Sequence, residues 1–227
     1  MKTEIAVLDT EGQAYRRELI GLFGRGIAAA IPEEEFNRIA LRLFDYQFRK
    51  NEPYAAYCRR RGRLPDTITH WTEIPAVPTS AFKEVALLTG RVEDAEATFR
   101  TSGTTRGYER RGEHHVLDLS LYHTSLLPTF AAYVLPDGAE LPMLSLLPPA
   151  EEMPDSSLVH MVDVVSDRLG ATGSGSFATV DGGIDEDRLE TTLRRYEEEG
   201  TPVCLLGTSF SFVHWLDALR DDGRSWQ

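Results

Sequence analysis

The pattern that most constrains the fold begins near residue 85, where short apolar runs start to alternate with segments of helical periodicity. Residues 143–147 form one apolar run, which Pro148 and Pro149 stop, and residues 202–206 form another. Helix-like segments lie between these runs at about 156–170 and 185–200. Short apolar strands separated by helices are typical of a mostly parallel sheet flanked by helices. The pattern therefore predicts an α/β fold for this part of the chain.

Weaker signals complete the pattern. Residues 97–99 and 177–180 predict further strands, and residues 118–134 and 209–220 predict further helices. Asp118 is expected to cap the first of these helices, and Pro128 is expected to bend or break it.

The first third of the chain has a different pattern. Residues 33–62 predict helix, because three glutamates follow Pro32 and apolar residues then recur at helical spacing. The tripeptide Asn51-Glu52-Pro53 is expected to break this stretch in two. Residues 74–78 contain two prolines and predict a stiff, extended connector. The expected organisation is a helical N-terminal region with a Pro-rich connector over residues 1–84, followed by the α/β region over residues 85–227.

The composition argues against several classes of protein. The 227 residues carry a formal net charge of −12, whereas nucleic-acid binding needs a basic surface. No apolar run approaches the roughly 18–20 residues of a membrane span, and the N-terminus lacks the layout of a signal peptide. The expected location is the cytoplasm, where Cys58 and Cys204 would be free thiols. Neither cysteine is expected to be a nucleophile.

The segment richest in chemistry is the loop that would follow the strand at 97–99. Its residues combine hydroxyl groups with glycines: Thr101, Ser102, Gly103, Thr104, Thr105, Arg106 and Gly107. Free backbone N–H groups and hydroxyl donors suit the binding of a phosphate. Ordinary surface loops have the same composition, so the order of the residues must decide between the two interpretations.

That order, Thr-Ser-Gly-Thr-Thr, resembles the phosphate-binding loop of adenylate-forming enzymes. The Pro-rich segment at 74–83 and the Leu-Gly-Thr-Ser-Phe segment at 206–210 are similar to segments of the LuxE-type acyl-protein synthetase family. All three segments occur in that family's order, and the resemblance covers roughly residues 35–220. It implies the large domain of an adenylate-forming enzyme, with residues 101–107 at the phosphates of ATP.

The resemblance also implies an activity. Enzymes of this family use ATP, with Mg²⁺, to convert a long-chain fatty acid or another carboxylic acid to an acyl-adenylate. The acyl group then passes to a protein thiol, so the implied partners are the acid and an acyl-acceptor protein or a reductase. Two alternatives stay open: an acyl-CoA synthetase similar to phenylacetate–CoA ligase, and a catalytically silent binding or assembly domain.

The chain departs from the family pattern in two ways. Arg106 stands where the family loop has a glycine, and a guanidinium there would give phosphate a bidentate contact. The family's acidic adenine and Mg²⁺ motif, ribose-binding aspartate, lysine-bearing subdomain and acyl-accepting cysteine are not recognisable. We therefore expect the nucleotide-binding region 85–227 to be incomplete and the isolated chain to be weakly active or inactive, and we assign no catalytic residue and no metal ligand.

A few residues outside the loop are secondary candidates. Gly207, Thr208 and Ser209 would join a strand to a helix, where hydroxyl and N–H groups could reach an acyl group or a nucleotide. A simple helix cap explains them equally well. His114 is a further candidate for this pocket, with an exposed turn as the alternative. Its neighbour His115 would point to the opposite side of a strand, so the pair is not expected to bind a metal.

Overall fold

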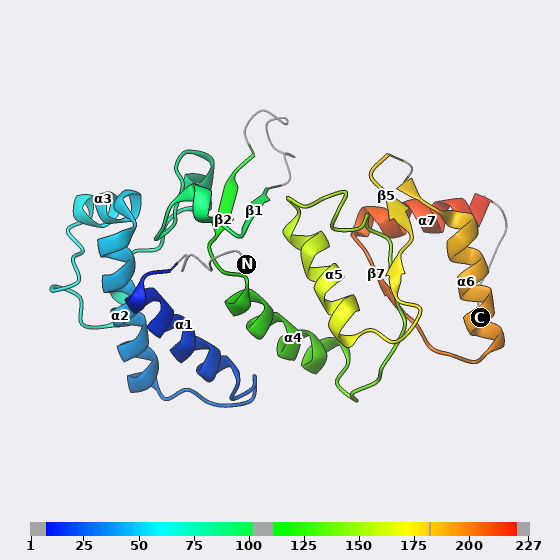
Figure 1. Cartoon of the computed structure of the whole chain (residues 1–227), viewed down its shortest axis with the longest axis horizontal. Coiled ribbons are helices and arrows are strands. Elements are labelled where there is room, and N and C mark those ends of the chain that lie inside the picture. Colours follow the sequence, from blue (N-terminus) through cyan, green and yellow to red (C-terminus); the bar gives the residue numbers. More distant parts are fainter. Residues whose placement is uncertain (1–7, 102–110, 182, 222–227) are drawn as a thin grey trace, which may run out of the picture. The chain divides into compact units, whose positions relative to one another are not determined.

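The computed structural model describes residues 8–101, 111–181 and 183–221 (Figure 1). The chain forms two compact units, residues 1–125 and 126–227. The division after residue 84 that the sequence suggests stays a prediction. None of the described helices is both long and apolar enough to cross a membrane.

The N-terminal unit is mainly helical. Its helices are α1 (Thr10–Phe23), α2 (Glu33–Lys50) and α3 (Glu52–Arg60), and short 3-10 turns follow at Trp71–Glu73, Thr79–Lys83 and Val92–Asp94. The break predicted between α2 and α3 is confirmed: the Asn51 side chain accepts the N–H of Tyr54 at 3.1 Å and so begins α3. The connector at 75–78 has no regular structure, as its prolines predict.

Helix α1 has no counterpart in the sequence-based expectations. Asp9 caps it by accepting the Gly12 N–H at 2.8 Å. Gly12 is its one buried residue among those described, and a Cβ there would lie 2.5 Å from the Tyr46 hydroxyl of α2. The helix is held to α2 by ion pairs, Glu18 with Arg42 at 3.0 Å and Glu11 with Arg49 at 2.7 Å. The helix is held in place by contacts with residues distant in sequence, so the apolar residues of this segment alone do not predict it.

The core of the N-terminal unit is aromatic. Phe44, Tyr54, Cys58 and Ile68 are buried together, and the rings of Phe44 and Tyr54 meet edge to face at 6.0 Å. Burial raises the pKa of the Cys58 thiol, which lowers the fraction of thiolate near neutral pH.

Strands β1 (Ala97–Arg100) and β2 (Glu113–Val116) form an antiparallel pair in the N-terminal unit. The sequence had suggested that the strand at 97–99 belongs to a mostly parallel sheet, and this is corrected here. The pairing is local, because residues 97–100 meet the next strand along the chain, Ala97 opposite Val116 and Arg100 opposite Glu113.

Helix α4 (Ser120–Val134) starts in the N-terminal unit and ends in the other. It runs through Pro128 without the break considered from the sequence. Asp118 lies just before it, accepts the Ser120 N–H at 2.8 Å and pairs with Arg16 at 2.7 Å.

The C-terminal unit contains the parallel sheet that the sequence predicts. Strands β3 (Met143–Ser145), β4 (Gly175–Ser176) and β7 (Cys204–Leu206) pair in the order β4-β3-β7. Helices α5 (Ser157–Leu169), α6 (Glu186–Glu198) and α7 (Ser209–Asp221) lie where helical periodicity indicated them. The strand expected at 177–180 is present as β5 (Ala178–Thr179), but it pairs antiparallel with β6 (Gly183–Ile184) and lies outside the parallel sheet.

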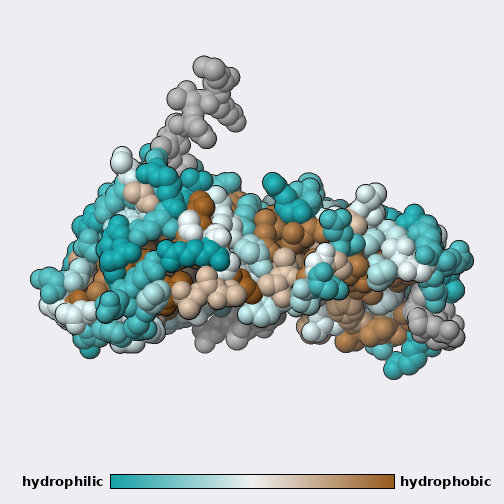
Figure 2. All heavy atoms as spheres, turned by 90° about the horizontal axis from the view of Figure 1, so that it is seen from below, coloured by the Kyte–Doolittle hydropathy of each residue, from teal (hydrophilic) through white to brown (hydrophobic). Residues whose placement is uncertain are grey.

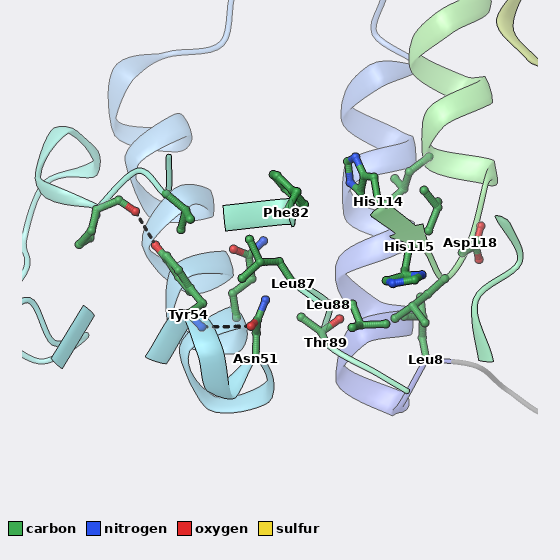
Figure 3. A pocket seen from close by; sticks show the side chains of 16 residues that line it. Leu8, Asn51, Tyr54, Phe82, Leu87, Leu88, Thr89, His114, His115 and Asp118 are labelled. Atoms are coloured by element: carbon green, nitrogen blue, oxygen red, sulfur yellow. Dashed lines mark hydrogen bonds between the residues drawn. The ribbon is translucent and has the colours of Figure 1, made fainter. Parts of the chain in front are cut away.

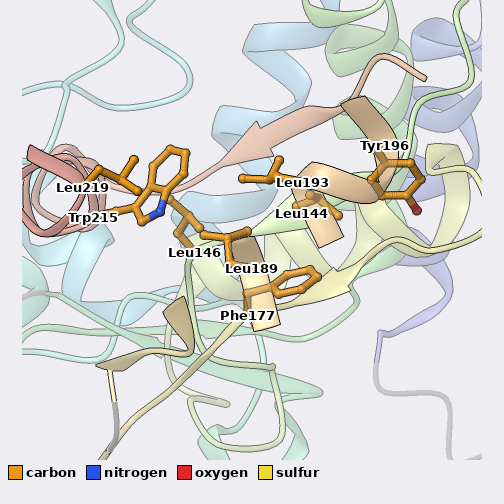
Figure 4. Close-up of a cluster of buried hydrophobic side chains, with 8 residues drawn as sticks. All are labelled: Leu144, Leu146, Phe177, Leu189, Leu193, Tyr196, Trp215 and Leu219. Atoms are coloured by element: carbon orange, nitrogen blue, oxygen red, sulfur yellow. The ribbon is translucent and has the colours of Figure 1, made fainter. Parts of the chain in front are cut away.

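Alternating side chains of β3 build two cores in this unit. Leu144 joins Leu189 and Leu193 of α6 and Trp215 of α7 in one buried cluster (Figure 4). Met143, the preceding residue, packs with Val165 of α5 in another. Because neighbouring strand residues point to opposite faces, helices cover both sides of the sheet.

Both units expose some large apolar side chains. On the face drawn in Figure 2, hydrophobic residues interrupt the hydrophilic surface mainly over the C-terminal unit. Helix α7 contributes exposed apolar side chains at Phe210, Val213 and Leu216, of which Phe210 is 78% exposed.

Candidate functional site

The carboxyl ends of β3 and β7 form the first candidate site. The chain leaves β3 toward β4 on one side, and β7 lies on the other side of β3. In open parallel sheets, ligands bind outside the strand ends where the connections diverge in this way. The Leu146 N–H donates to the Leu206 carbonyl at 2.7 Å, which holds the two strand ends together.

The turn from β7 into α7 contains Gly207, Thr208 and Ser209. Thr208 caps α7: its hydroxyl accepts the Ser211 N–H at 3.1 Å and lies 2.8 Å from the Ser211 hydroxyl. Ser209 is the first residue of the helix. A Cβ on Gly207 would lie 3.1 Å from the Leu146 Cβ, so glycine permits the close approach of this turn to the β3 end. The capping interpretation of Thr208 therefore holds, whereas its role at a ligand stays a prediction.

A pocket of about 440 Å³ opens beside this turn; we call it the strand-end pocket. Its apolar lining comes from Leu146, Leu147, Pro148, Ala178 and Ile184. Its polar lining comes from Thr179, Glu186, Thr208, Ser211 and His214, and Phe210 adds an aromatic ring. An exposed ring beside an apolar floor suits a flat heterocycle, and the hydroxyls next to a helix N-terminus suit a polar or anionic group.

The phosphate loop predicted from the sequence lies almost wholly outside the described residues. This concerns Ser102, Gly103, Thr104, Thr105, Arg106 and Gly107. Thr101 is described, and it closes the β1–β2 pair: its N–H donates to the Gly112 carbonyl at 2.9 Å, and its hydroxyl accepts the Gly112 N–H at 2.9 Å. Arg111 donates to the Thr101 carbonyl at 2.8 Å. These bonds fix both ends of the loop.

His114 and His115 lie on β2 and line a second cavity, of about 500 Å³ (Figure 3). We call it the N-terminal cavity. The His114 ring lies 5.0 Å from the Phe82 ring, and its partial burial, together with the neighbouring His115, lowers its pKa. The His115 side chain is only 6% exposed and shares a 2.9 Å hydrogen bond with the Thr98 hydroxyl.

The structure thus divides the predicted residues between the units. Thr101 and His114 belong to the N-terminal unit, and Gly207, Thr208 and Ser209 belong to the C-terminal unit. His214 and Glu186 line the strand-end pocket and were missed from the sequence, because they come from different helices and share no local motif. In the described parts of the chain, no three His, Cys, Asp or Glu side chains gather as a metal site.

The donor set of the strand-end pocket fits a nucleotide in part. Hydroxyl groups of Thr208 and Ser211 are present, but no Lys or Arg is among the described residues that line it. A polyphosphate needs cations as well. Such cations would have to come from residues that do not line the described pocket.

An α/β chain with a ligand pocket at the ends of parallel strands is a familiar class of binding and catalytic protein. Comparison with known proteins narrows the class. A long-chain-fatty-acid–luciferin-component ligase of Vibrio harveyi is 23% identical over 192 residues, which are 83% of this chain and 48% of that protein. A ligase of the same name from Photorhabdus luminescens is 34% identical over 80 residues, which are 34% of this chain and 68% of that protein.

The chain belongs, as a distant member, to the family of these ligases, the LuxE-type acyl-protein synthetases. The resemblance inferred from the three sequence segments is thereby confirmed. The chain spans about half the length of the Vibrio harveyi relative. No family model and no solved structure matches it.

Proposed function

We propose that this chain takes part in the ATP-dependent activation of a long-chain fatty acid. The carboxylate oxygen attacks the α-phosphorus of ATP, the bond to the β-phosphate oxygen breaks, and acyl-adenylate and pyrophosphate form. The acyl group then passes to a thiol with release of AMP. The observation that carries this proposal is the similarity to a fatty-acid ligase over 83% of the chain.

Residues 101–107 are proposed to hold the phosphates of ATP. Thr101 would act indirectly, since its hydroxyl and carbonyl already close the β1–β2 pair with Gly112 and Arg111. Arg106 would supply a positive charge to these phosphates. Mg²⁺ would neutralise developing charge on the phosphates when bound.

Within the C-terminal unit, the strand-end pocket is proposed to bind the base of a nucleotide. Its position at the carboxyl ends of β3 and β7 supports this assignment. Thr208 keeps the first turn of α7 in place, and the Ser211 hydroxyl lies beside it at 2.8 Å. Phe210 offers a ring on which a base can stack.

We propose that neither cysteine of this sequence accepts the acyl group. The sequence contains two cysteines, Cys58 and Cys204. Burial raises the pKa of both thiols, which keeps them protonated and weakly nucleophilic. Neither therefore suits acyl acceptance.

Exchange of labelled pyrophosphate into ATP, with a panel of fatty and aromatic acids, tests the proposal. Exchange that needs a long-chain acid supports it, and so does ATP binding that Thr104→Ala abolishes even when exchange is slow. A folded chain that binds no ATP would support a silent assembly domain instead. Exchange with aromatic acids and acyl transfer to CoA would favour the phenylacetate–CoA-ligase type.

A further inference from the structure

The N-terminal cavity is separate in sequence and composition from the strand-end pocket. It lies within the N-terminal unit, between helices α2 and α3, the Pro-rich connector, residues 87–89 and strand β2 (Figure 3). Its volume of about 500 Å³ falls within the range of small-molecule sites, which is roughly 300–1,000 Å³.

Several polar groups in the cavity wall already have partners in the protein. The Tyr54 hydroxyl donates to the Pro75 carbonyl at 3.0 Å, and the Asn51 side-chain oxygen (Oδ1) accepts the Tyr54 N–H. His115 is bonded to Thr98, and Asp118 is paired with Arg16. Groups satisfied in this way do not attract a polar ligand strongly. The surface left to a ligand is dominated by side chains such as Val77, Leu87, Leu88 and Leu117.

His114 differs from these groups. No hydrogen bond reaches its imidazole nitrogens within the described part of the chain, and the residue is exposed at one side. Its lowered pKa makes the neutral ring the main form near pH 7. A neutral imidazole can donate one hydrogen bond to an oxygen atom. No Lys or Arg lines the cavity among the described residues, so a carboxylate finds no countercharge inside it.

We propose that the N-terminal cavity binds the hydrocarbon chain of a fatty acid, with the methyl end inside and the carboxyl end at His114. The choice of a fatty acid as the ligand rests on the proposed function. The expectation that the ligand is apolar rests only on the residues that line the cavity. Each methylene buried should raise affinity about fourfold until the cavity is filled. The cavity then selects acids by chain length.

A displacement assay tests this proposal without ATP. A fluorescent polyene fatty acid is bound to the protein and then displaced by saturated acids from octanoate to octadecanoate. Leu87→Trp fills the cavity and should weaken binding at least about tenfold. Val85→Trp is the matched control, because Val85 is 42% exposed, lies two residues away and does not line the cavity. Leu88→Ala enlarges the cavity and should shift the preferred acid to a longer chain, which keeps the test decisive if Leu87→Trp fails to fold.

Two results would overturn the proposal: no displacement that depends on chain length, or equal binding by wild type, Leu87→Trp and Leu88→Ala. Pyrophosphate exchange, measured on the same samples, reports the proposed function separately. If all variants catalyse pyrophosphate exchange with the same preference among acids, the cavity does not bind the hydrocarbon chain of the acid, but the proposed activity is supported. Binding in the cavity without exchange or ATP binding would reject the activity and leave the cavity as an acyl site.

Discussion

The strand-end pocket and the N-terminal cavity have similar volumes, about 440 and 500 Å³, but they are built differently. The strand-end pocket gathers hydroxyls where strands end and a helix begins, because a parallel sheet brings such turns to one edge. The N-terminal cavity is bordered by helices, a proline-rich connector and a strand, and leucine and valine side chains make up much of its lining. One site suits a nucleotide and the other an apolar chain, so the contrast predicts two ligands with separate determinants.

The largest expected effect concerns the core beneath the strand-end pocket. Leu144→Ala removes a side chain with 0% exposure from the cluster around Leu189 and Trp215. The cavity left behind should lower the free energy of unfolding by about 2–5 kcal/mol. Urea unfolding followed by Trp215 fluorescence, with Trp71 and Trp226 replaced by Phe, measures it. Leu216→Ala, at 54% exposure, should change it by less than about 0.5 kcal/mol, and equal losses would refute the assigned core.

A glycine beside the sheet should give the next largest effect. Gly173 has φ +95°, and an added Cβ would collide with the Tyr196 hydroxyl. Gly173→Ala should cost about 3 kcal/mol through strain and overlap together. Gly138 has φ +69° with open space around it, so Gly138→Ala should cost only about 1 kcal/mol. Thermal unfolding of both variants separates steric overlap from backbone strain, and a smaller loss at Gly173 would contradict the packing described.

Removing the cap of α7 should have a moderate effect on stability and tests the strand-end pocket directly. Thr208→Ala deletes the oxygen that accepts the Ser211 N–H, which should cost about 1 kcal/mol. Without the cap, Thr208→Ala should also weaken ATP binding. Thr208→Ser keeps the cap and should therefore retain both the stability and the ATP binding of the wild type. Fatty acid binding should be the same in all three proteins. Loss of fatty acid binding in a folded Thr208→Ala protein would break the contrast between the two sites.

The smallest effect is a pH dependence in the N-terminal unit. The pKa of His114 is lowered from 6.5 in the folded chain, so below this pH the unfolded chain binds the proton first. Stability contributed by neutral His114 is therefore present above pH 6.5 and decreases as the pH falls toward the lowered pKa. His114→Gln should flatten the dependence of urea unfolding on pH in this window. An identical slope in wild type and variant would remove His114 as its source.

The sequence predicted those elements whose signals are local. Asn51 and Pro53 predict the start of α3, and the apolar runs at 143–147 and 202–206 predict β3 and β7. Helix α1 was missed because ion pairs and the close approach of Gly12 to Tyr46 hold it in place. The direction of β1 was wrong because its pairing partner, and not its own composition, determines it.

The candidate sites, like the helices and strands, could be predicted from the sequence only where their residues are close together along the chain. The turn at Gly207 and Thr208 could be found from sequence, because a strand, a cap and a helix follow one another along the chain. The N-terminal cavity could not, since Leu8 and Leu121 line it together and are separated by more than a hundred residues. Burial of His115 likewise depends on contacts made by the folded unit.

Calorimetric titration of ATP and of dodecanoate into wild type, Leu87→Trp and Ser211→Trp tests the central claim most directly. Leu87→Trp should lose the acid and retain ATP, because it fills only the N-terminal cavity. Ser211→Trp should lose ATP and retain the acid, because it fills only the strand-end pocket. Equal weakening of both ligands by either folded variant, or binding of neither ligand to the wild type, would contradict the assignment of two separate sites.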